Sequence, residues 1–345
     1  MVKTTKVAAD RAHDKTKTVL PAEVARGVYV ENAPSAESLK LMHLLIGTAG
    51  GRMADDVRHE IRLAEVKAVK GMRNHSRATL RQLFIELKQA VLIFDDEETQ
   101  CEVLGGFMDE IRIDHQHEVS DDLMITWYFG RTFRTMADQS CHWAIMDRQT
   151  VFALSSKYSI MLFQHISSLA NLDYVTSKTF TVPELRAALG VAEGKLSAWN
   201  DVNKRALKPA IAEINQTSRL TLTATPRKIG RTVFSVEIAW EDKPLEGRKV
   251  ARRELDRSKV GRKVRRDGTA ETPVTAFPAS GSVKDTQPWD RIAREHAPKL
   301  EGRHTPDLRQ LADAFRKWCD GKSINLDASS IEKSFTTWCK SYSAR

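Results

Sequence analysis

The sequence predicts an α+β fold, mainly α-helical, in which one order of elements occurs twice. Amphipathic helices followed by alternating strands occur over residues 35–145 and again over 146–241. A charged stretch without apolar periodicity then precedes a short helical region near the C-terminus. We therefore expect two tandem α+β domains and a small C-terminal helical segment over 289–345.

The composition is that of a water-soluble protein. Of the 345 residues, 41% are hydrophobic and 29% are charged. No uninterrupted apolar run approaches the roughly 20 residues of a membrane span, and the N-terminus lacks the apolar stretch of a secretory signal. We therefore expect a cytoplasmic protein without a membrane partner. Its four cysteines are scattered singly, which predicts reduced, structural thiols rather than a zinc site: Cys101, Cys141, Cys319 and Cys339.

Basic residues outnumber acidic ones by 54 to 45, giving a net charge of +9. Such an excess favours a polyanionic partner. It is concentrated between Lys243 and Asp267, where eleven basic residues face four acids. We predict a basic disordered linker over 242–288, which either lies along nucleic acid or only keeps the chain soluble. Residues 1–34 lack periodicity and predict a disordered arm.

The first repeat contains three helices and a group of strands. The expected segments are a helix from Ser35 to Gly50, a strand at 59–63, helices at 64–72 and 77–92, and strands at 91–94, 101–113 and 122–129. Ser35 and Ser76 are suited to N-caps. Arg77 and Arg81 fall outside the apolar stripe of the third helix and are candidate phosphate contacts. Helices followed by a hairpin describe a winged-helix domain.

The second repeat follows the same order. The expected segments are a helix at 154–172, a short helix opened by Thr181, Pro183 and Glu184 and closed by Gly190, a long helix at 196–217, and strands at 220–225 and 232–240. The strands flank the turn Pro226-Arg-Lys-Ile-Gly-Arg231. This turn carries three cations and would form a basic wing.

The long helix of the second repeat is the candidate recognition helix. Its polar side carries the residues Lys195, Asn200, Asn203, Lys204 and Lys208. Asn and Lys side chains read base edges in the major groove and bind phosphates. The same pattern also suits an ordinary solvated amphipathic helix. The basic wing beside it, with Arg227, Lys228 and Arg231, favours DNA binding.

We expect no catalytic residue, no metal site and no cofactor. A rolling-circle type nickase would need two metal-binding histidines around a hydrophobic residue, and a nucleophilic tyrosine. The nearest pattern, His115-Gln116-His117, has a polar central residue, and neither Tyr128 nor Tyr158 lies in a supporting motif. No glycine-rich phosphate-binding loop occurs, so ATPase chemistry has no site.

Four motifs in the second repeat resemble the iteron-binding plasmid initiator Rep family. They are Leu154-Ser-Ser-Lys-Tyr-Ser-Ile, Phe180-Thr-Val-Pro-Glu-Leu-Arg-Ala-Ala-Leu-Gly190, Asn203-Lys-Arg-Ala-Leu-Lys-Pro-Ala-Ile-Ala-Glu-Ile-Asn215 and the Gly230-Arg231 hairpin. The resemblance covers roughly residues 150–240 and is architectural over 36–145. It implies two tandem winged helices, the first used for dimerisation and further DNA contact and the second for iterons.

The resemblance also implies a site and partners. In the family's long helix, the DNA-contacting part corresponds here to Lys195, Asn203, Lys204, Arg205 and Lys208. This chain departs from the family's denser Lys/Arg cluster by having Trp199-Asn-Asp-Val-Asn203. The implied partners are origin direct repeats in double-stranded DNA, the host initiator and replicative helicase, and a second copy in a dimer–monomer equilibrium.

The implied function is origin opening, recruitment of host proteins and repression of the chain's own gene. A pure winged-helix transcriptional regulator remains an alternative, and tandem direct repeats rather than one inverted repeat beside the gene would distinguish the two. The C-terminal segment is either a packing module or a contact for host replication factors.

Overall fold

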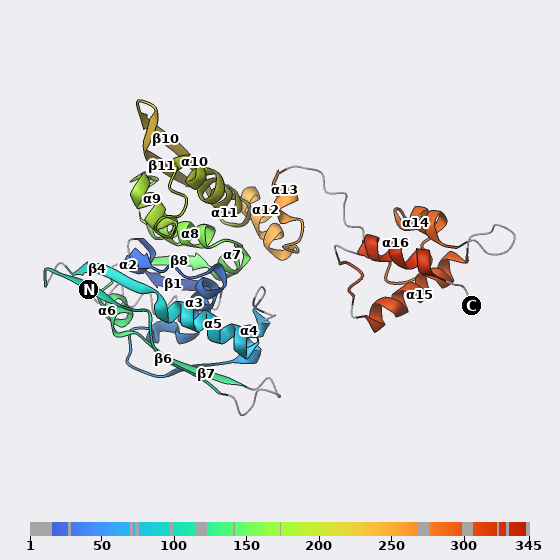
Figure 1. Ribbon diagram of the computed structural model, residues 1–345, viewed down its shortest axis with the longest axis horizontal. Coiled ribbons are helices and arrows are strands. Elements are labelled where there is room, and N and C mark those ends of the chain that lie inside the picture. The colour runs from blue at the N-terminus through green and yellow to red at the C-terminus, as the bar shows by residue number, and fades with distance from the viewer. Residues whose placement is uncertain are drawn as a thin grey trace. The chain divides into compact units, whose positions relative to one another are not determined.

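The computed structural model describes residues 16–26, 29–69, 72, 76–96, 99–114, 123–140, 142–172, 174–267, 276–298, 306–322, 324–328 and 331–342. The chain forms two compact units, residues 1–258 and 259–345 (Figure 1). The larger unit combines helices with small antiparallel sheets, and the described part of the smaller one is helical. The predicted α+β class is therefore confirmed.

The first repeat has the predicted elements in order, with one further helix at 131–139 that the sequence did not predict. They are α3 (Ala36–Ala49), η1 (Gly50–Arg52), β3 (His59–Arg62), α4 (Leu63–Ala68), α5 (Arg77–Gln89), β4 (Val91–Asp96), β5 (Cys101–Gly106), β6 (Met108–Ile113), β7 (Met124–Phe129) and α6 (Arg131–Gln139). Ser35 and Ser76 cap α3 and α5, as predicted. The order β3-β7-β6 makes a wing after the helices. The predicted strand at 101–113 is broken into β5 and β6 at the buried Phe107.

The second repeat has the same topology. Its elements are α7 (Arg148–Ala153), α8 (Lys157–Ala170), β9 (Ser177–Thr181), α9 (Val182–Ala188), α10 (Trp199–Val202), the π-helical turn η3 (Asn203–Leu207), α11 (Lys208–Thr217), β10 (Leu220–Ile229) and β11 (Thr232–Asp242). The sheet order β9-β11-β10 repeats β3-β7-β6. The predicted helix at 154–172 begins only at Lys157, because the side chain of Ser156 accepts the backbone N–H of Ser159 as an N-cap.

The predicted disordered arm over 1–34 is wrong for its second half. β1 (Lys17–Pro21) pairs antiparallel with β8 (Trp143–Asp147), and α2 (Ala22–Arg26) packs on α8. β2 (Tyr29–Glu31) pairs with β4. These elements are too short to show a period, and their partners lie far along the chain. Residues 1–15 lie outside the described part.

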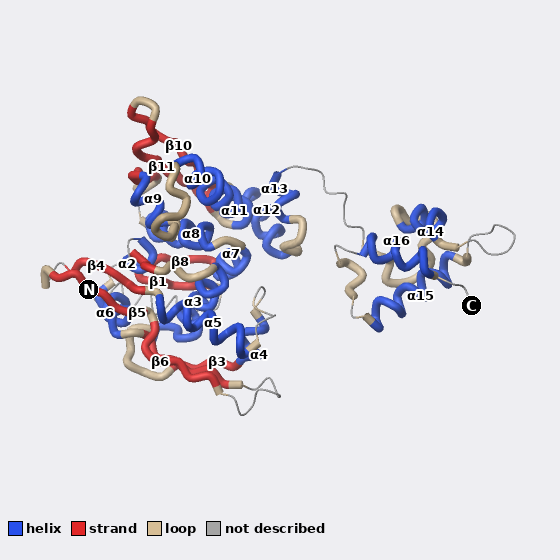
Figure 2. The backbone as a smooth tube through the Cα atoms, viewed as in Figure 1, coloured by secondary structure: helices blue, strands red, loops and turns tan. Residues whose placement is uncertain are grey.

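The two repeats share one apolar core. Strand β8 spans the predicted boundary between residues 145 and 146. The β1–β8 pair lies between α8 of the second repeat and α3 of the first (Figure 2). A single buried cluster runs from Leu20 to Trp240. The residues between the repeats therefore pack as part of the core rather than as a linker.

The predicted disordered linker over 242–288 is also wrong for most of its described residues. α12 (Leu245–Asp256) packs against α7 and α11 and buries Ala251 and Leu255. A second helix, α13 (Arg262–Asp267), follows. The apolar residues of α12 are few and stand among many charges, so they give little periodic signal in the sequence. Residues 268–275 lie outside the described part.

The C-terminal unit is a helical segment, as predicted, and it has an aromatic core. It contains α14 (Trp289–His296), α15 (Leu308–Gly321) and α16 (Ile331–Ser341). Its core includes Phe277 and Val283, which lie in the stretch predicted as linker and are buried against Trp289, Phe315 and Phe335. The unit therefore begins before the predicted residue 289.

Two of the three described cysteines are buried, as a structural role requires. Cys319 and Cys339 lie in the core of the C-terminal unit, and all three described cysteines are free thiols. Cys101 is exposed on β5, so a structural role is wrong for it. Its strand pairs with β4 on one side only and leaves this side chain facing water.

We expect acid to destabilise the protein through His43. Burial, with a smaller effect from the nearby Arg148 guanidinium, lowers the pKa of His43 from 6.5 to about 3. The unfolded chain therefore binds a proton below pH 6.5 that the folded chain rejects. Stability is lost as pH falls through this window, by about 1.4 kcal/mol per pH unit for this group.

Urea unfolding of the wild type and His43→Leu between pH 6 and 4.5 would measure this effect. As the pH falls, the variant should lose less unfolding free energy per pH unit than the wild type does. The difference should be about the 1.4 kcal/mol per pH unit that one bound proton contributes. Identical slopes would contradict a neutral, buried His43.

Candidate nucleic-acid interface

The long helix of the second repeat presents a polar face to solvent. α10, the π-helical turn and α11 follow one another without a break from Trp199 to Thr217. The inward side is buried and comprises Val202, Ala206, Leu207, Ala210 and Ile214. The outward side is exposed and comprises the predicted residues Asn200, Lys204, Arg205 and Lys208. Asn203 is half-buried at the edge of this face.

The helix departs from α-geometry at the residues predicted to meet DNA. The backbone N–H of Lys208 donates to the carbonyl of Asn203, five residues earlier. Pro209 follows at once, and its ring has no N–H and crowds the carbonyl four residues before it. A wider π-helical turn relieves such crowding. It also changes the direction of the side chains of Asn203, Lys204 and Arg205 relative to α11.

The cations of this face are largely unneutralised. Among the described residues, no carboxylate lies within ion-pair distance of Lys204 or Lys208, and both are exposed. Arg205 lies 3.4 Å from Asp201, one turn earlier, with 70% of its side chain exposed. An exposed pair of this kind contributes little and can be exchanged for a phosphate. The face is therefore available to an anionic partner.

Lys195 lies in the loop before the helix, and that loop is held by a residue that the sequence did not single out. The guanidinium of Arg186, on α9, donates to the backbone carbonyls of Lys195 and Leu196. Leu196 has a φ of 47°, a conformation that non-glycine residues rarely adopt. Nothing local in the sequence identifies Arg186, because its partners are backbone atoms of a different segment.

We expect Arg186→Ala to lower DNA affinity about tenfold without any contact to DNA. Loss of a hydrogen bond of roughly 1–1.5 kcal/mol would let the loop and the start of the helix move. Fluorescence anisotropy with a labelled site would measure the affinity, with the exposed Arg309→Ala in the C-terminal unit as control. Unchanged affinity for Arg186→Ala would contradict a positioning role.

The β10–β11 hairpin carries the predicted basic residues beside this helix (Figure 1). The strands extend further than predicted, and the turn is only Gly230-Arg231, with Gly230 at φ 62°. Pro226 is tolerated because β10 is an edge strand. Arg227 therefore lies in the strand and forms an ion pair with Glu237 at 2.7 Å. Lys228 and Arg231 are exposed.

Partly buried hydrogen bonds fix the helix against the rest of the domain. The carboxylate of Glu213, 5% exposed, accepts from the backbone N–H of Ser155 at 2.9 Å and also from its hydroxyl. The amide of Asn215 donates to the carbonyl of Leu222 at 2.9 Å and accepts its N–H at 2.7 Å. The Glu-Ile-Asn motif therefore ties α11 to the start of α8 and to β10.

Arg77 and Arg81 belong to a different surface. They lie on α5, which packs against α3 and β6, away from the hairpin in Figure 1. With Lys88 and Glu110 they line a groove of about 360 Å³ between α5 and β6. The structure therefore brings together the predicted residues of the long helix and the wing, but not the two arginines of the first repeat.

The described residues bear on metal ligation and on membrane insertion. They contain no group of three or more metal-ligating side chains. None of their helices is long and apolar enough to cross a membrane. His115 and His117 lie outside the described part of the chain.

Comparison with known proteins agrees with the motifs of the second repeat. Residues 181–240 match the family described as initiator Rep protein, WH2. None of the curated proteins matches the chain. Among solved structures, the Pi initiator protein in complex with iteron DNA is 15% identical with a TM-score of 0.49, over 67% of this chain and 99% of that chain. Domains 2 and 3 of RctB, as selenomethionine derivatives, are 9% identical with a TM-score of 0.36, over 60% of this chain and 82% of that one.

Proposed function

Because residues 181–240 carry the WH2 domain of the initiator Rep family, we propose that the chain is a plasmid replication initiator that binds direct repeats in double-stranded origin DNA. The observation that supports this most strongly is the exposed face of the long helix beside the basic hairpin. A helix and a wing of one domain can contact the major groove and the neighbouring minor groove of DNA.

The two parts of the interface would do different work. Asn200 and Asn203 carry amides, which pair with adenine edges in the major groove. Lys204, Arg205 and Lys208 would bind phosphates or guanine. On the wing, Arg227, Lys228 and Arg231 would follow the backbone or enter the minor groove. Lys195 would contact a phosphate at the start of the helix.

Several steps of the proposal go beyond binding. The bound protein would help to open the origin and recruit the host initiator and helicase in the bacterial cytoplasm. As a dimer it would repress its own gene, and as a monomer it would bind the repeats. Arg77 and Arg81 in the first repeat would add further DNA contacts. The chain would act without catalysis, metal or cofactor.

Titration of the full chain onto the DNA that flanks its gene would test this proposal. Stepwise occupancy of tandem direct repeats, resistant to unrelated competitor DNA, is the expected result. Binding to a single inverted repeat would favour a transcriptional regulator instead. Metal-dependent cleavage of supercoiled DNA, lost on substitution of Tyr128 or Tyr158, would favour a nickase. Equal affinity for every sequence would overturn specific binding.

The wing should determine part of the dependence of DNA affinity on salt concentration. Each neutralised phosphate contributes about 0.9 to the slope of log affinity against log salt. Lys228→Ala with Arg231→Ala should therefore reduce this slope by about 2 and weaken binding to all sequences alike. Affinity measured over a salt series would show it, with Lys317→Ala plus Arg309→Ala, both exposed in the C-terminal unit, as the charge-matched control. An unchanged slope would place the wing away from DNA.

A further inference from the structure

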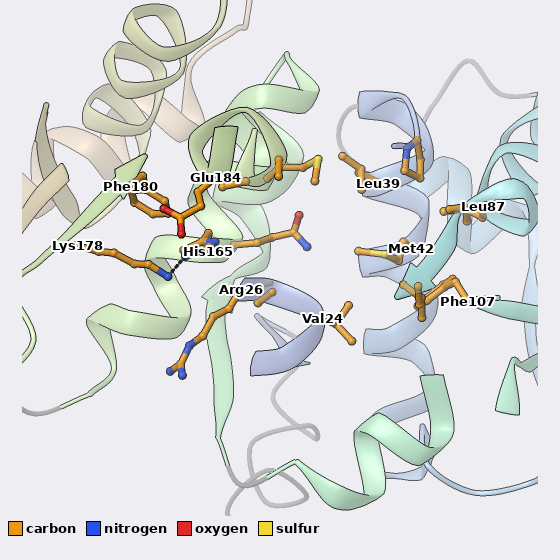
Figure 3. Close-up of a pocket in the computed structure, with 18 residues that line it drawn as sticks. Val24, Arg26, Leu39, Met42, Leu87, Phe107, His165, Lys178, Phe180 and Glu184 are labelled. Carbon is orange, nitrogen blue, oxygen red and sulfur yellow. Dashed lines mark hydrogen bonds between the residues drawn. The ribbon is translucent and has the colours of Figure 1, made fainter. Parts of the chain in front are cut away.

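A cavity of about 230 Å³ lies inside the larger unit, where the two repeats meet. Figure 3 shows Leu39, Met42, Leu87 and Phe107, all from the first repeat, on one side of it. Side chains of α8, β9 and α9 line the other side. The volume exceeds the roughly 150 Å³ of an engineered cavity that holds benzene. It can therefore accommodate an organic ligand of about ten heavy atoms.

One end of the cavity is basic. Lys178 of β9 places its Nζ 3.5 Å from Nε2 of His165 and 5.0 Å from the centre of the Phe180 ring (Figure 3). Arg26 of α2 also lines the cavity, and its guanidinium donates to the hydroxyl and carbonyl of Ser168 at 3.0 and 2.8 Å. Basic side chains thus line this end of the cavity from α2 and from the consecutive elements α8 and β9, although the Arg26 guanidinium points away from His165 and Lys178 in Figure 3.

This positive charge lacks a close counter-ion. Among the described residues, no carboxylate lies within ion-pair distance of Arg26 or Lys178. Glu184 lines the cavity and raises the pKa of Lys178 from a distance. Its carboxylate is already engaged, because it accepts the backbone N–H of Thr181 at 2.7 Å in the capping box of α9.

The protonation of His165 reflects the same imbalance. Burial, together with the charges of Lys178 and Arg26, lowers the pKa of His165 to about 3. Burial likewise lowers the pKa of Lys178, and Arg26 lowers it further. Cations that border an apolar space raise the free energy of the folded protein unless an anion offsets them.

We propose that this cavity binds a small amphipathic carboxylate, whose apolar chain lies against Leu39, Met42 and Phe107 and whose carboxylate contacts Lys178. A chain of about six to eight carbons fits the volume. The apolar lining and the basic end of the cavity together fit this ligand class. An inorganic anion would leave the apolar part empty, and an alcohol would bring no negative charge to the basic end. The inference does not depend on DNA binding.

Such a ligand would bridge the two repeats. Its apolar part would contact α3 and α5, and its charged end β9, which pairs with the wing strand β11. A ligand that binds only the folded arrangement stabilises it by mass action. The ligand would therefore stabilise the junction between the two repeats.

Thermal unfolding of the full chain with octanoate would test the site. Saturating octanoate should raise the Tm by about 2–4 °C, while octanol and inorganic phosphate at equal ionic strength should raise it much less. Lys178→Met should abolish the octanoate shift, and the exposed Lys228→Met should retain it. Equal shifts with octanol, or an undiminished shift in Lys178→Met, would overturn a carboxylate site.

A measurement on the wild type avoids dependence on how the variant folds. At neutral pH, octanoate should shift the ring signals of His165 in NMR spectra of labelled histidine, because its carboxylate would lie beside this ring, while octanol should shift them much less. Saturating octanoate that leaves both the Tm and the His165 ring signals unchanged would overturn the proposal.

Discussion

Replacement of Lys204, Arg205 and Lys208 together by alanine is expected to lower affinity for the repeat DNA at least about 100-fold. The three side chains are exposed on one face of the long helix. Each contact to a phosphate or base is worth roughly 1–3 kcal/mol in such interfaces. The effect should exceed that of the wing variants, because a helix in the major groove also determines the register of the whole domain.

The control for this experiment is a second triple variant with the same change in charge. Lys249, Arg252 and Arg253 are exposed on α12, which packs behind α11. Their replacement by alanine should cost far less specific affinity. Fluorescence anisotropy of both variants, with repeat DNA and with scrambled DNA, would separate the two cases. Equal losses in the two triple variants would mean that net charge rather than the helix face binds the DNA.

Glu213→Ala is expected to lower the free energy of unfolding by about 2–4 kcal/mol. The carboxylate is almost fully buried and accepts two hydrogen bonds from Ser155. Its removal leaves the backbone N–H of Ser155 without this acceptor and creates a cavity at the buried position of Glu213 on α11. Urea unfolding followed by circular dichroism would measure the change.

Two further variants distinguish the hydrogen bonds from the lost volume. Glu213→Gln keeps an acceptor oxygen and nearly the same size, so it should cost clearly less than Glu213→Ala. In a double-mutant cycle with Ser155→Ala, which keeps the backbone N–H, the coupling free energy should reflect the bond to the hydroxyl. If Glu213→Ala lowers the free energy of unfolding by less than about 0.5 kcal/mol, the hydrogen bonds between Glu213 and Ser155 do not stabilise the domain as proposed. At temperatures where Glu213→Ala is still folded, it should bind DNA almost as the wild type does.

The residues of the motif in the long helix have different roles in the structure. The sequence singled out Leu-x-Pro-Ala-Ile-x-Glu-Ile-Asn as a pattern around the DNA-contacting face. The structure shows that Glu213 and Asn215 in it are internal clamps rather than contact residues. It also shows that the proline coincides with a π-helical turn. The cations Lys204, Arg205 and Lys208, which lie before this proline, are exposed instead.

The sequence by itself determined α3, α5 and α9 with their caps, and the polar face of the long helix. Ser35, Ser76 and Thr181 act on backbone groups three residues away, and the apolar stripe of α5 repeats within the helix. Signals of this kind lie within a few residues of the atoms that they stabilise. They can therefore be read without knowledge of the rest of the chain.

Tertiary structure alone decided the remainder. β1 is a strand because β8 supplies its hydrogen bonds, and α12 is a helix packed on α7 and α11 although charge dominates its sequence. Arg186 holds a loop through backbone carbonyls, and Arg26 lines the same cavity as His165 and Lys178, which lie more than 130 residues further along the chain. Each of these depends on contacts between residues far apart in the chain, whose free energy leaves no local pattern.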